Sequence, residues 1–280
     1  MRPPSHRLQI SVLLFALGLA ACAPPPSAAE VQAQSAPTLI AATRPRAWDY
    51  VAIGGDFTYG QGWDEVFAEH LEQDLGVEIR FQDLSTHDNI RLDRWLERIQ
   101  TDAELRQAIE EAEVLTFDLP DIAYLARPTT LYESGFCGGD DGKECLRETM
   151  AQLEADLGPF LDEALQLADP SETLVYTFDL GSLLPYIPVD IGVGGEFIQP
   201  LSGEEMRTWA DYELEAYRLL REAVEGRGIK VVDLVPTFQP DGPYTVPPEE
   251  KYFLMLGFSA EGEAVIADLL RQAGYDYDRP

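Results

Sequence analysis

Residues 50–60 read Tyr50-Val51-Ala52-Ile53-Gly54-Gly55-Asp56-Phe57-Thr58-Tyr59-Gly60. The first four residues continue a short apolar run that begins near Asp49, and the run stops at two glycines. This is the pattern of a buried strand that ends in a tight turn. In open parallel sheets, ligands bind beyond the carboxyl ends of the strands. The stretch therefore predicts a buried strand at Asp49–Ile53, with a site at Gly54–Gly60.

Outward from this stretch, short β-rich runs alternate with amphipathic segments. We expect further strands at Val77–Phe81, Val114–Phe117, Leu174–Phe178 and Lys230–Val235. The apolar periodicity predicts helices at Gln61–Leu75, Ile90–Ile99, Ala103–Ala112, Leu146–Leu167, Glu204–Glu225, and from a cap at Ser259 through Leu270. Strands separated by helical crossovers imply a parallel sheet with helices on both faces. The predicted fold is a three-layer α/β/α sandwich of the flavodoxin-like type, over residues 48–280.

The sheet-edge rule directs attention to three more segments, besides the loop after the first strand. These are Asp83–Asn89, Asp118–Ile122 and the loop just before Ser259. The Gly- and Pro-containing segment Gly181–Gly203 also carries apolar residues, so its composition would allow a lid.

The N-terminus has the features of an export signal. Arg2 and Arg7 precede an apolar run, Ile10–Ala21, which is short for a membrane span and typical of a signal peptide. The run ends in Leu19-Ala20-Ala21-Cys22, which resembles the lipobox of bacterial lipoproteins. We expect residues 1–21 to be the signal, Cys22 to carry the lipid, and residues 22–47 to be a flexible Ala/Pro/Ser tether. A plain secretory signal with an incidental cysteine is the alternative.

The charge balance is strongly acidic. The chain has 20 Lys and Arg against 50 Asp and Glu, a formal net charge of −30. Such a surface repels phosphate backbones, which excludes nucleic acid as a partner. It favours cationic ligands or metal ions, or it is simply a solvated acidic surface.

Two cysteines remain beyond Cys22. Cys137 and Cys145 flank a Gly- and Asp-rich loop. In an exported protein, such a local pair is expected to be oxidised. A zinc site would need further Cys or His ligands, and the chain has three His, of which His6 lies in the signal. We therefore predict a Cys137–Cys145 disulfide.

Four blocks, in this order and spacing, resemble the SGNH/GDSL hydrolase superfamily. Residues 50–60 resemble its first block, a strand ending in Gly-Asp-Ser and followed by an apolar residue, Thr and Gly. The three other similar blocks are Phe81-Gln82-Asp83-Leu84-Ser85, Glu113-Val114-Leu115-Thr116-Phe117, and Ser259-Ala260-Glu261-Gly262 with Val265-Ile266-Ala267. The Cys-Gly-Gly-Asp loop is also similar to one extracellular subgroup. The resemblance implies the SGNH fold from about Trp48 onward.

The signature residues of that superfamily are replaced. The serine nucleophile falls at Asp56, and the preceding Asp falls at Gly55. The glycine of the oxyanion hole falls at Asp88, or at Ser85 with a shorter loop. The remaining positions are Ile122 for the oxyanion Asn, Gly257 for the catalytic His and Leu254 for its Asp. Loss of one oxyanion donor alone costs about 10²–10³ in rate, and loss of the serine removes the acyl-enzyme route. We expect a pseudoenzyme with no catalytic residues of the family type and no cofactor.

Three interpretations of the altered cleft follow. Aromatic residues near its mouth, Tyr59, Tyr124, Trp63 and Phe57, would suit a glycan or another small extracellular ligand. Four carboxylates at the same sheet edge, Asp56, Asp88, Asp118 and Asp121, would suit Ca²⁺, or they are solvated residues and helix caps. Ser85 and His87, in one loop, would form a displaced nucleophile and base, which makes an active esterase or carbohydrate deacetylase the alternative function. A surface lipoprotein without a ligand is a third functional class, after the ligand-binding pseudoenzyme and the active hydrolase. His70, far along the first helix, is expected to be exposed or cap-like, as is His87.

Overall fold

The computed structural model describes residues 47–88, 90–119, 121–181, 203–242, 244, 253–254 and 257–276. Residues 45–280 form one compact unit by their internal contacts. The predicted signal, Cys22, most of the tether and nearly all of the proposed lid lie outside the described residues. Within the described ranges, no helix is both long and apolar enough to cross a membrane.

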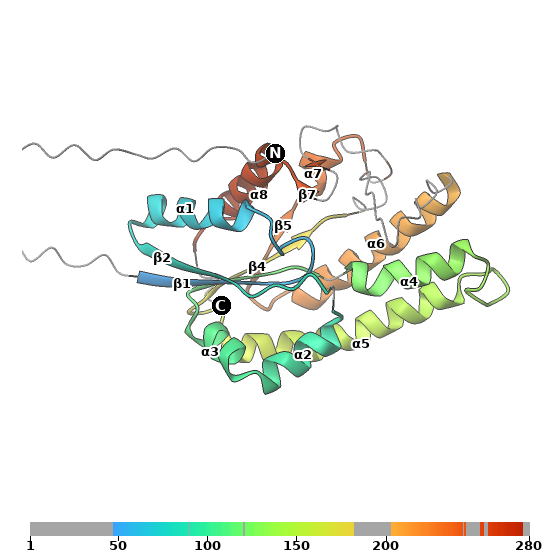
Figure 1. Cartoon of the computed structure of the whole chain (residues 1–280), viewed down its shortest axis with the longest axis horizontal. Helices are drawn as coiled ribbons and strands as arrows, with labels where there is room; N and C mark the ends of the chain where they lie inside the picture. The colour runs from blue at the N-terminus through green and yellow to red at the C-terminus, as the bar shows by residue number, and fades with distance from the viewer. Residues whose placement is uncertain are drawn as a thin grey trace, which may run out of the picture. The chain divides into compact units, whose positions relative to one another are not determined.

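A five-stranded sheet forms the centre of the described unit, in the order β2-β1-β3-β4-β5 (Figure 1). All four neighbouring pairs are parallel. The strands are β1 (Ala47–Ile53), β2 (Glu78–Asp83), β3 (Val114–Phe117), β4 (Leu174–Asp179) and β5 (Ile229–Asp233). Each of the five predicted strands is confirmed, although several ends are shifted by one or two residues.

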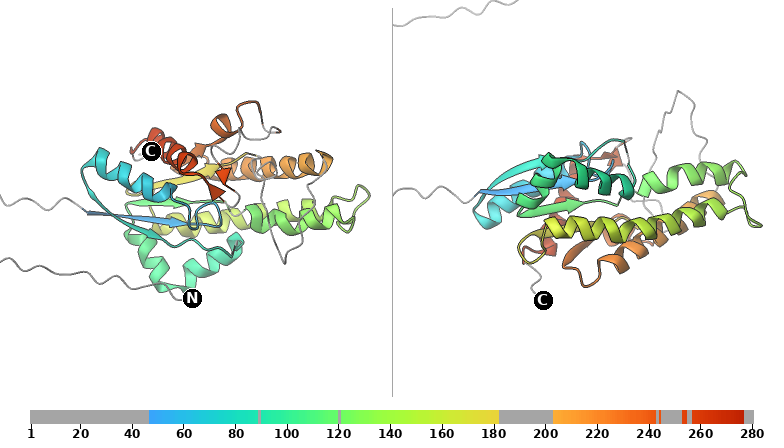
Figure 2. Two further views of the ribbon diagram at one scale, coloured as in Figure 1. Left: turned by 45° about the horizontal axis from the view of Figure 1, so that its top comes forward. Right: turned by 90° about the horizontal axis from the view of Figure 1, so that it is seen from below.

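Helices cover both faces of this sheet, which confirms the three-layer α/β/α prediction. On one face, α1 (Trp63–Leu75) packs against α8 (Ala260–Ala273). On the other lie α2 (Leu92–Thr101), α3 (Ala103–Glu111) and α5 (Glu144–Leu167), as Figures 1 and 2 show. The sixth helix, α6 (Gly203–Val224), packs against α5.

The core follows from the mostly apolar sequences of the central strands. Every residue of β3 and β4 is buried, and so are the last four residues of β1. Strands buried on both faces are characteristic of a parallel sheet between two helical layers. The face of α1 predicted from periodicity is confirmed, because Trp63, Phe67 and Leu71 are buried. At α8, the predicted cap Ser259 accepts a hydrogen bond from the N–H of Gly262 at 3.2 Å.

Three features of the fold were not predicted. The largest is α4 (Asp121–Glu133), which contains Pro128 and packs against α5 and α6. Proline is read as a helix breaker because it lacks an N–H, but packing on two neighbouring helices offsets that loss. The other two are the short helix α7 (Val235–Phe238) and the antiparallel pair β6 (Phe253–Leu254) and β7 (Gly257–Phe258). Because α7 begins at Val235, the strand predicted through that residue ends at Asp233 instead.

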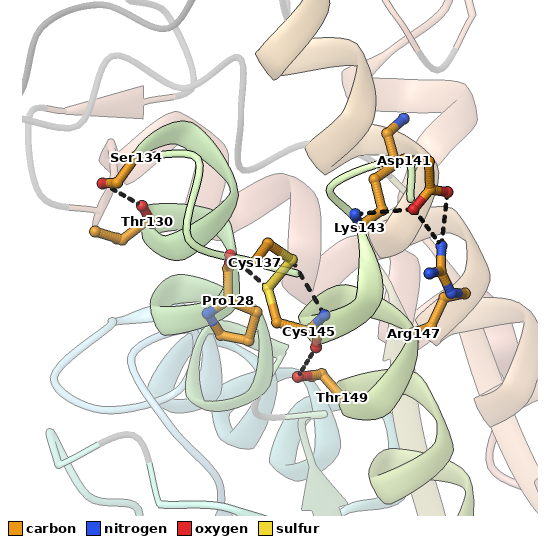
Figure 3. Close-up of a disulfide and its surroundings, with 9 residues drawn as sticks. All are labelled: Pro128, Thr130, Ser134, Cys137, Asp141, Lys143, Cys145, Arg147 and Thr149. Carbon is orange, nitrogen blue, oxygen red and sulfur yellow. Dashed lines mark hydrogen bonds and ion pairs between the residues drawn. A yellow bond between two sulfur atoms is a disulfide. The ribbon is translucent and has the colours of Figure 1, made fainter. Parts of the chain in front are cut away.

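The predicted disulfide is present. Cys137 and Cys145 are bonded, with their Cα atoms 4.9 Å apart. Cys137 follows α4 and Cys145 lies in the first turn of α5, so the bond joins the ends of two packed helices (Figure 3). The carbonyl oxygen of Pro128 lies 3.3 Å from the Cys145 sulfur. A disulfide sulfur carries no hydrogen, so this is a packing contact that keeps the bond against α4.

Candidate functional site

The loop after β1 is held close to the end of β3. The N–H groups of Thr58 and Tyr59 both donate to the carbonyl of Gly55, at 3.0 and 2.8 Å. Gly54 has a φ of +156°, and a Cβ built on it would lie 2.4 Å from the carboxyl carbon of Asp118. This close approach explains why a glycine ends the strand. The loop is therefore packed directly on the Asp118 side chain.

Asp118 turns into the protein. It directly follows β3 and is 3% exposed. Its two carboxylate oxygens accept the N–H of Gly55 at 2.8 and 3.1 Å, and one also accepts the Thr58 hydroxyl at 2.9 Å. Burial raises the pKa of Asp118 to about 6, and these hydrogen bonds oppose the rise while the charge of Asp56 adds to it. From the sequence, a solvated residue and a helix cap were two of the interpretations of Asp118. The structure contradicts both, because the side chain is buried and bonded to Gly55 and Thr58.

Asp56, which the sequence resemblance aligns with a serine nucleophile, pairs with His87. Its Oδ1 lies 2.8 Å from Nδ1 of His87, and the two side chains are 35% and 77% exposed. The Tyr59 ring stacks on the imidazole, with centroids 5.6 Å apart and planes at 29°. A carboxylate bonded to Nδ1 fixes the orientation of the ring and favours a proton on that nitrogen. Asp56, His87 and Tyr59 thus form one partly exposed group, which we call the strand-end site.

Two other predicted site residues have local partners. The Ser85 hydroxyl hydrogen-bonds the Asp83 carboxylate, and the Ser85 N–H also donates to Asp83 at 2.9 Å. No hydrogen bond joins Ser85 to His87 among the described residues, so the displaced nucleophile–base pair is not formed in this structure. Asp88 is exposed, and its N–H donates to the Thr86 hydroxyl at 3.2 Å.

The structure describes only part of the predicted set of calcium ligands. Asp121 begins α4, but its side chain lies outside the described residues, as does that of Ile122. Among the residues that the structure describes, no group of three or more His, Cys, Asp or Glu is arranged to hold a metal ion.

The loop before α8 lies beside the strand-end site, as the sheet-edge rule requires. Gln61 makes the connection: its amide nitrogen donates to the Asp56 carbonyl at 3.4 Å, and its oxygen accepts the Phe258 N–H at 3.1 Å. The positions aligned with the catalytic Asp and His, Leu254 and Gly257, are in the β6–β7 pair that ends at Phe258. The sequence did not reveal the role of Gln61, because Phe258, one of its two partners, is distant along the chain.

The aromatic residues near the predicted mouth divide into two classes. Tyr59 is 47% exposed beside His87. Phe57 instead packs on Trp63, Phe178 and Phe258, with centroids 5.7, 4.9 and 5.4 Å away. Trp63 and Tyr124 are also buried, at 0% and 2% exposed. Tyr59 is therefore the one member of the predicted aromatic group that stands at the surface of the described chain.

His70 also departs from expectation. Its side chain is 15% exposed, and Nε2 lies 3.9 Å from Asp268 of α8. It is part of the packing between α1 and α8, neither exposed nor a cap. Its distance along α1 still separates it from the strand-end site, as predicted.

Comparison with known proteins was made by sequence and by structure. No protein-family model and no curated protein matches the sequence. A solved lipase from a goat rumen metagenome matches with a TM-score of 0.60 and 17% identity, covering 81% of this chain and 98% of that one. An extracellular lipase from Streptomyces rimosus matches with a TM-score of 0.54 and 12% identity, covering 81% of this chain and 100% of that one. The chain therefore shares the fold of these two lipases.

The sequence resemblance assigns the position of the nucleophile to Asp56. Asp56 lies in the loop that follows β1, and the N–H of Gly55 donates to the Asp118 carboxylate. By the sequence resemblance, a carboxylate therefore stands at the position where ester hydrolysis would need its nucleophile. At identities of 17% and 12%, the two lipases establish the fold, and the chemistry has to be argued from the residues present.

Proposed function

We propose that this chain is a non-hydrolytic SGNH-like protein that binds an extracellular ligand at its strand-end site. The observation that carries the proposal is the Asp118 carboxylate, buried against the N–H of Gly55 with Asp56 nearby. Two like charges about 4 Å apart repel by roughly 4 kcal/mol at an effective dielectric near 20. These carboxylates would therefore repel the negative charge that develops on an ester oxygen during acyl transfer. In addition, the loop after β1 has Asp56 in place of a serine that could attack the ester.

The exposed groups of the strand-end site suit a carbohydrate. Asp56 offers an acceptor for hydroxyl groups, His87 offers a ring nitrogen, and Tyr59 offers an aromatic face that is half exposed. Sugar rings combine many hydroxyl groups with apolar C–H faces, so they use both kinds of contact. The export signal and the lipid on Cys22, both expected from the sequence, support an extracellular ligand such as a glycan and an anchor in a membrane.

The test combines hydrolysis with binding, using residues 45–280, which form one compact unit. We expect no hydrolysis of short-chain nitrophenyl esters or acetylated sugars above the buffer rate. On an immobilised glycan panel, we expect retention that His87→Ala and Tyr59→Ala each weaken about tenfold or more. His70→Ala and Tyr244→Ala are the matched controls, because they alter the same residue types away from the strand-end site. Equal retention in all four variants would contradict the proposed site.

A second candidate function, a hydrolase with a displaced site, has one observation in its favour. The 2.8 Å contact between Asp56 and His87 is the pairing of an orienting acid with a general base. In that case the base acts on a water molecule or on Ser85 after a loop movement. Turnover of acetylated sugars that is lost in both His87→Ala and Asp56→Asn, and kept in His70→Ala, would favour this function over the first. Loss in Ser85→Ala as well would identify the nucleophile.

A further inference from the structure

A second cleft lies between α4 and α5, away from the residues of the strand-end site. Its volume is about 460 Å³, within the range of small-molecule pockets. Arg91, from the loop before α2, closes one side, and Tyr124, Arg127 and Leu131 of α4 form another. From α5 come Cys145 of the disulfide, Glu148, Thr149 and Gln152. The cleft therefore has two arginines and one carboxylate on its walls.

Arg91 is held in place by other residues of the fold. Its guanidinium carbon lies 5.1 Å from the centroid of the Tyr124 ring. One Nη atom donates to Asp156 at 3.1 Å, and Asp156 also accepts the Tyr124 hydroxyl at 2.8 Å. The Nε atom is buried and makes no hydrogen bond to any described residue, although it lies 3.6 Å from Asp93. Arg91 thus has a fixed position before any ligand arrives.

Arg127 differs from the other described arginines. Each of the others has an ion pair with a carboxylate or stacks on an aromatic ring. Arg127 has neither in the part of the chain that the structure describes, and it lines the cleft. Among the described arginines, Arg127 is thus the one with neither kind of partner, in a chain that has 50 acidic residues. A guanidinium that faces a cavity in this state is available to an external anion.

We propose that this cleft binds the carboxylate or phosphate group of a small ligand. The planar guanidinium of Arg127 can donate two parallel hydrogen bonds to either group. Gln152 donates one amide hydrogen to Asp156 at 2.7 Å, which leaves its second amide hydrogen for the ligand. The apolar part of the ligand would contact Leu131 and Pro128. Glu148 opposes the anion, which limits affinity and disfavours any ligand that cannot engage Arg127. The proposal does not depend on the strand-end site or on its ligand.

Calorimetric titration of the full chain with inorganic phosphate and, separately, with D-glucuronate tests the proposal. We expect saturable binding of at least one, and the pair of probes distinguishes a phosphate ester from a sugar acid. Arg127→Ala should weaken it about 10- to 100-fold, the range for losing a charge-assisted pair. Glu148→Gln should strengthen it several-fold, because it removes a like charge from the wall.

Arg227→Ala is the matched control, since Arg227 pairs with Asp162 and does not line this cleft. It should bind like the parent protein, and the unfolding midpoint of every variant is measured to show that each is folded. The proposal is overturned if neither anion gives a saturable heat up to about 10 mM, a weak limit on the affinity scale. It is also overturned if Arg127→Ala and Arg227→Ala have the same affinity, or if Glu148→Gln weakens binding.

Discussion

The strand-end site and the α4–α5 cleft are built in opposite ways. The first lies at the ends of parallel strands, where backbone hydrogen bonds continue past the sheet: Leu84 donates to Ala52 at 2.8 Å and Thr86 to Gly54 at 2.9 Å. It carries carboxylates. The second lies between helix faces, is lined by Cys145 of the disulfide, and carries two arginines and one carboxylate. One site therefore depends on backbone geometry and the other on side-chain packing, so they should respond differently to substitution, pH and reduction.

The largest effect is expected where the backbone leaves no space. Gly54→Ala places a methyl group 2.4 Å from the Asp118 carboxyl carbon, at a positive φ. Overpacking and backbone strain together should lower the free energy of unfolding by about 3–5 kcal/mol. Urea denaturation measures the change.

Gly60→Ala is the matched control for that substitution. Gly60 lies in the same loop at φ +65°, with no atom within 4 Å of its built Cβ. It should cost only about 1–2 kcal/mol, the strain of the left-handed conformation. If the two variants lose equal stability, Asp118 is not packed on the strand end as described.

The next effect is a dependence of stability on pH. The pKa of Asp118 is raised to about 6 in the folded protein, against about 3.9 in an unfolded chain. The folded state therefore holds this proton over a range where the unfolded state has lost it. Stability from Asp118 is highest below about pH 4 and falls by up to about 3 kcal/mol as the pH rises through 6. Burial also raises the pKa of Asp64, to about 7, so its contribution to stability should likewise fall as the pH rises.

Asp118→Asn isolates this contribution from those of other carboxylates. Its side-chain oxygen can still accept the Gly55 N–H, but the group no longer ionises. Denaturation series at pH 4, 6 and 8 should show a smaller fall in stability for the variant than for the parent. A parallel pair of pH curves would show that Asp118 is not the titrating group.

Removing the disulfide should have a smaller effect and act mainly on the other region. The bond closes a short loop, with a sequence separation of 8, and loop entropy predicts a loss of about 2–3 kcal/mol for the Cys137→Ser/Cys145→Ser variant. Because Cys145 lines the α4–α5 cleft, anion affinity should fall, whereas glycan retention at the strand-end site should not. Calorimetry and the glycan panel on the same preparation compare the two. Equal loss at both sites would mean that the regions are not independent.

The two regions also differ in how far sequence predicts them. Continuous apolar runs such as Tyr50–Ile53 and Val114–Phe117 located the central strands, and the ends of those strands located Asp56 and Asp118. The pattern did not show that Asp118 turns inward, because the partner of a side chain depends on three-dimensional packing. The α4–α5 cleft was not predicted at all. The helix α4 contains Pro128, and a proline is not expected inside a helix. The cleft residues Arg91, Arg127 and Glu148 come from three separate segments that only folding brings together.

The smallest effect on stability is expected at the exposed pair of the strand-end site. His87 is 77% exposed, so its contact with Asp56 is screened by water, and such pairs contribute about 0–1 kcal/mol. His87→Ala should therefore leave the unfolding free energy within about 1 kcal/mol of the parent while removing ligand retention. This combination separates a binding residue from a structural one. A large loss of stability together with unchanged retention would show that His87 has a structural role. It would also contradict the proposal that the strand-end site binds the ligand.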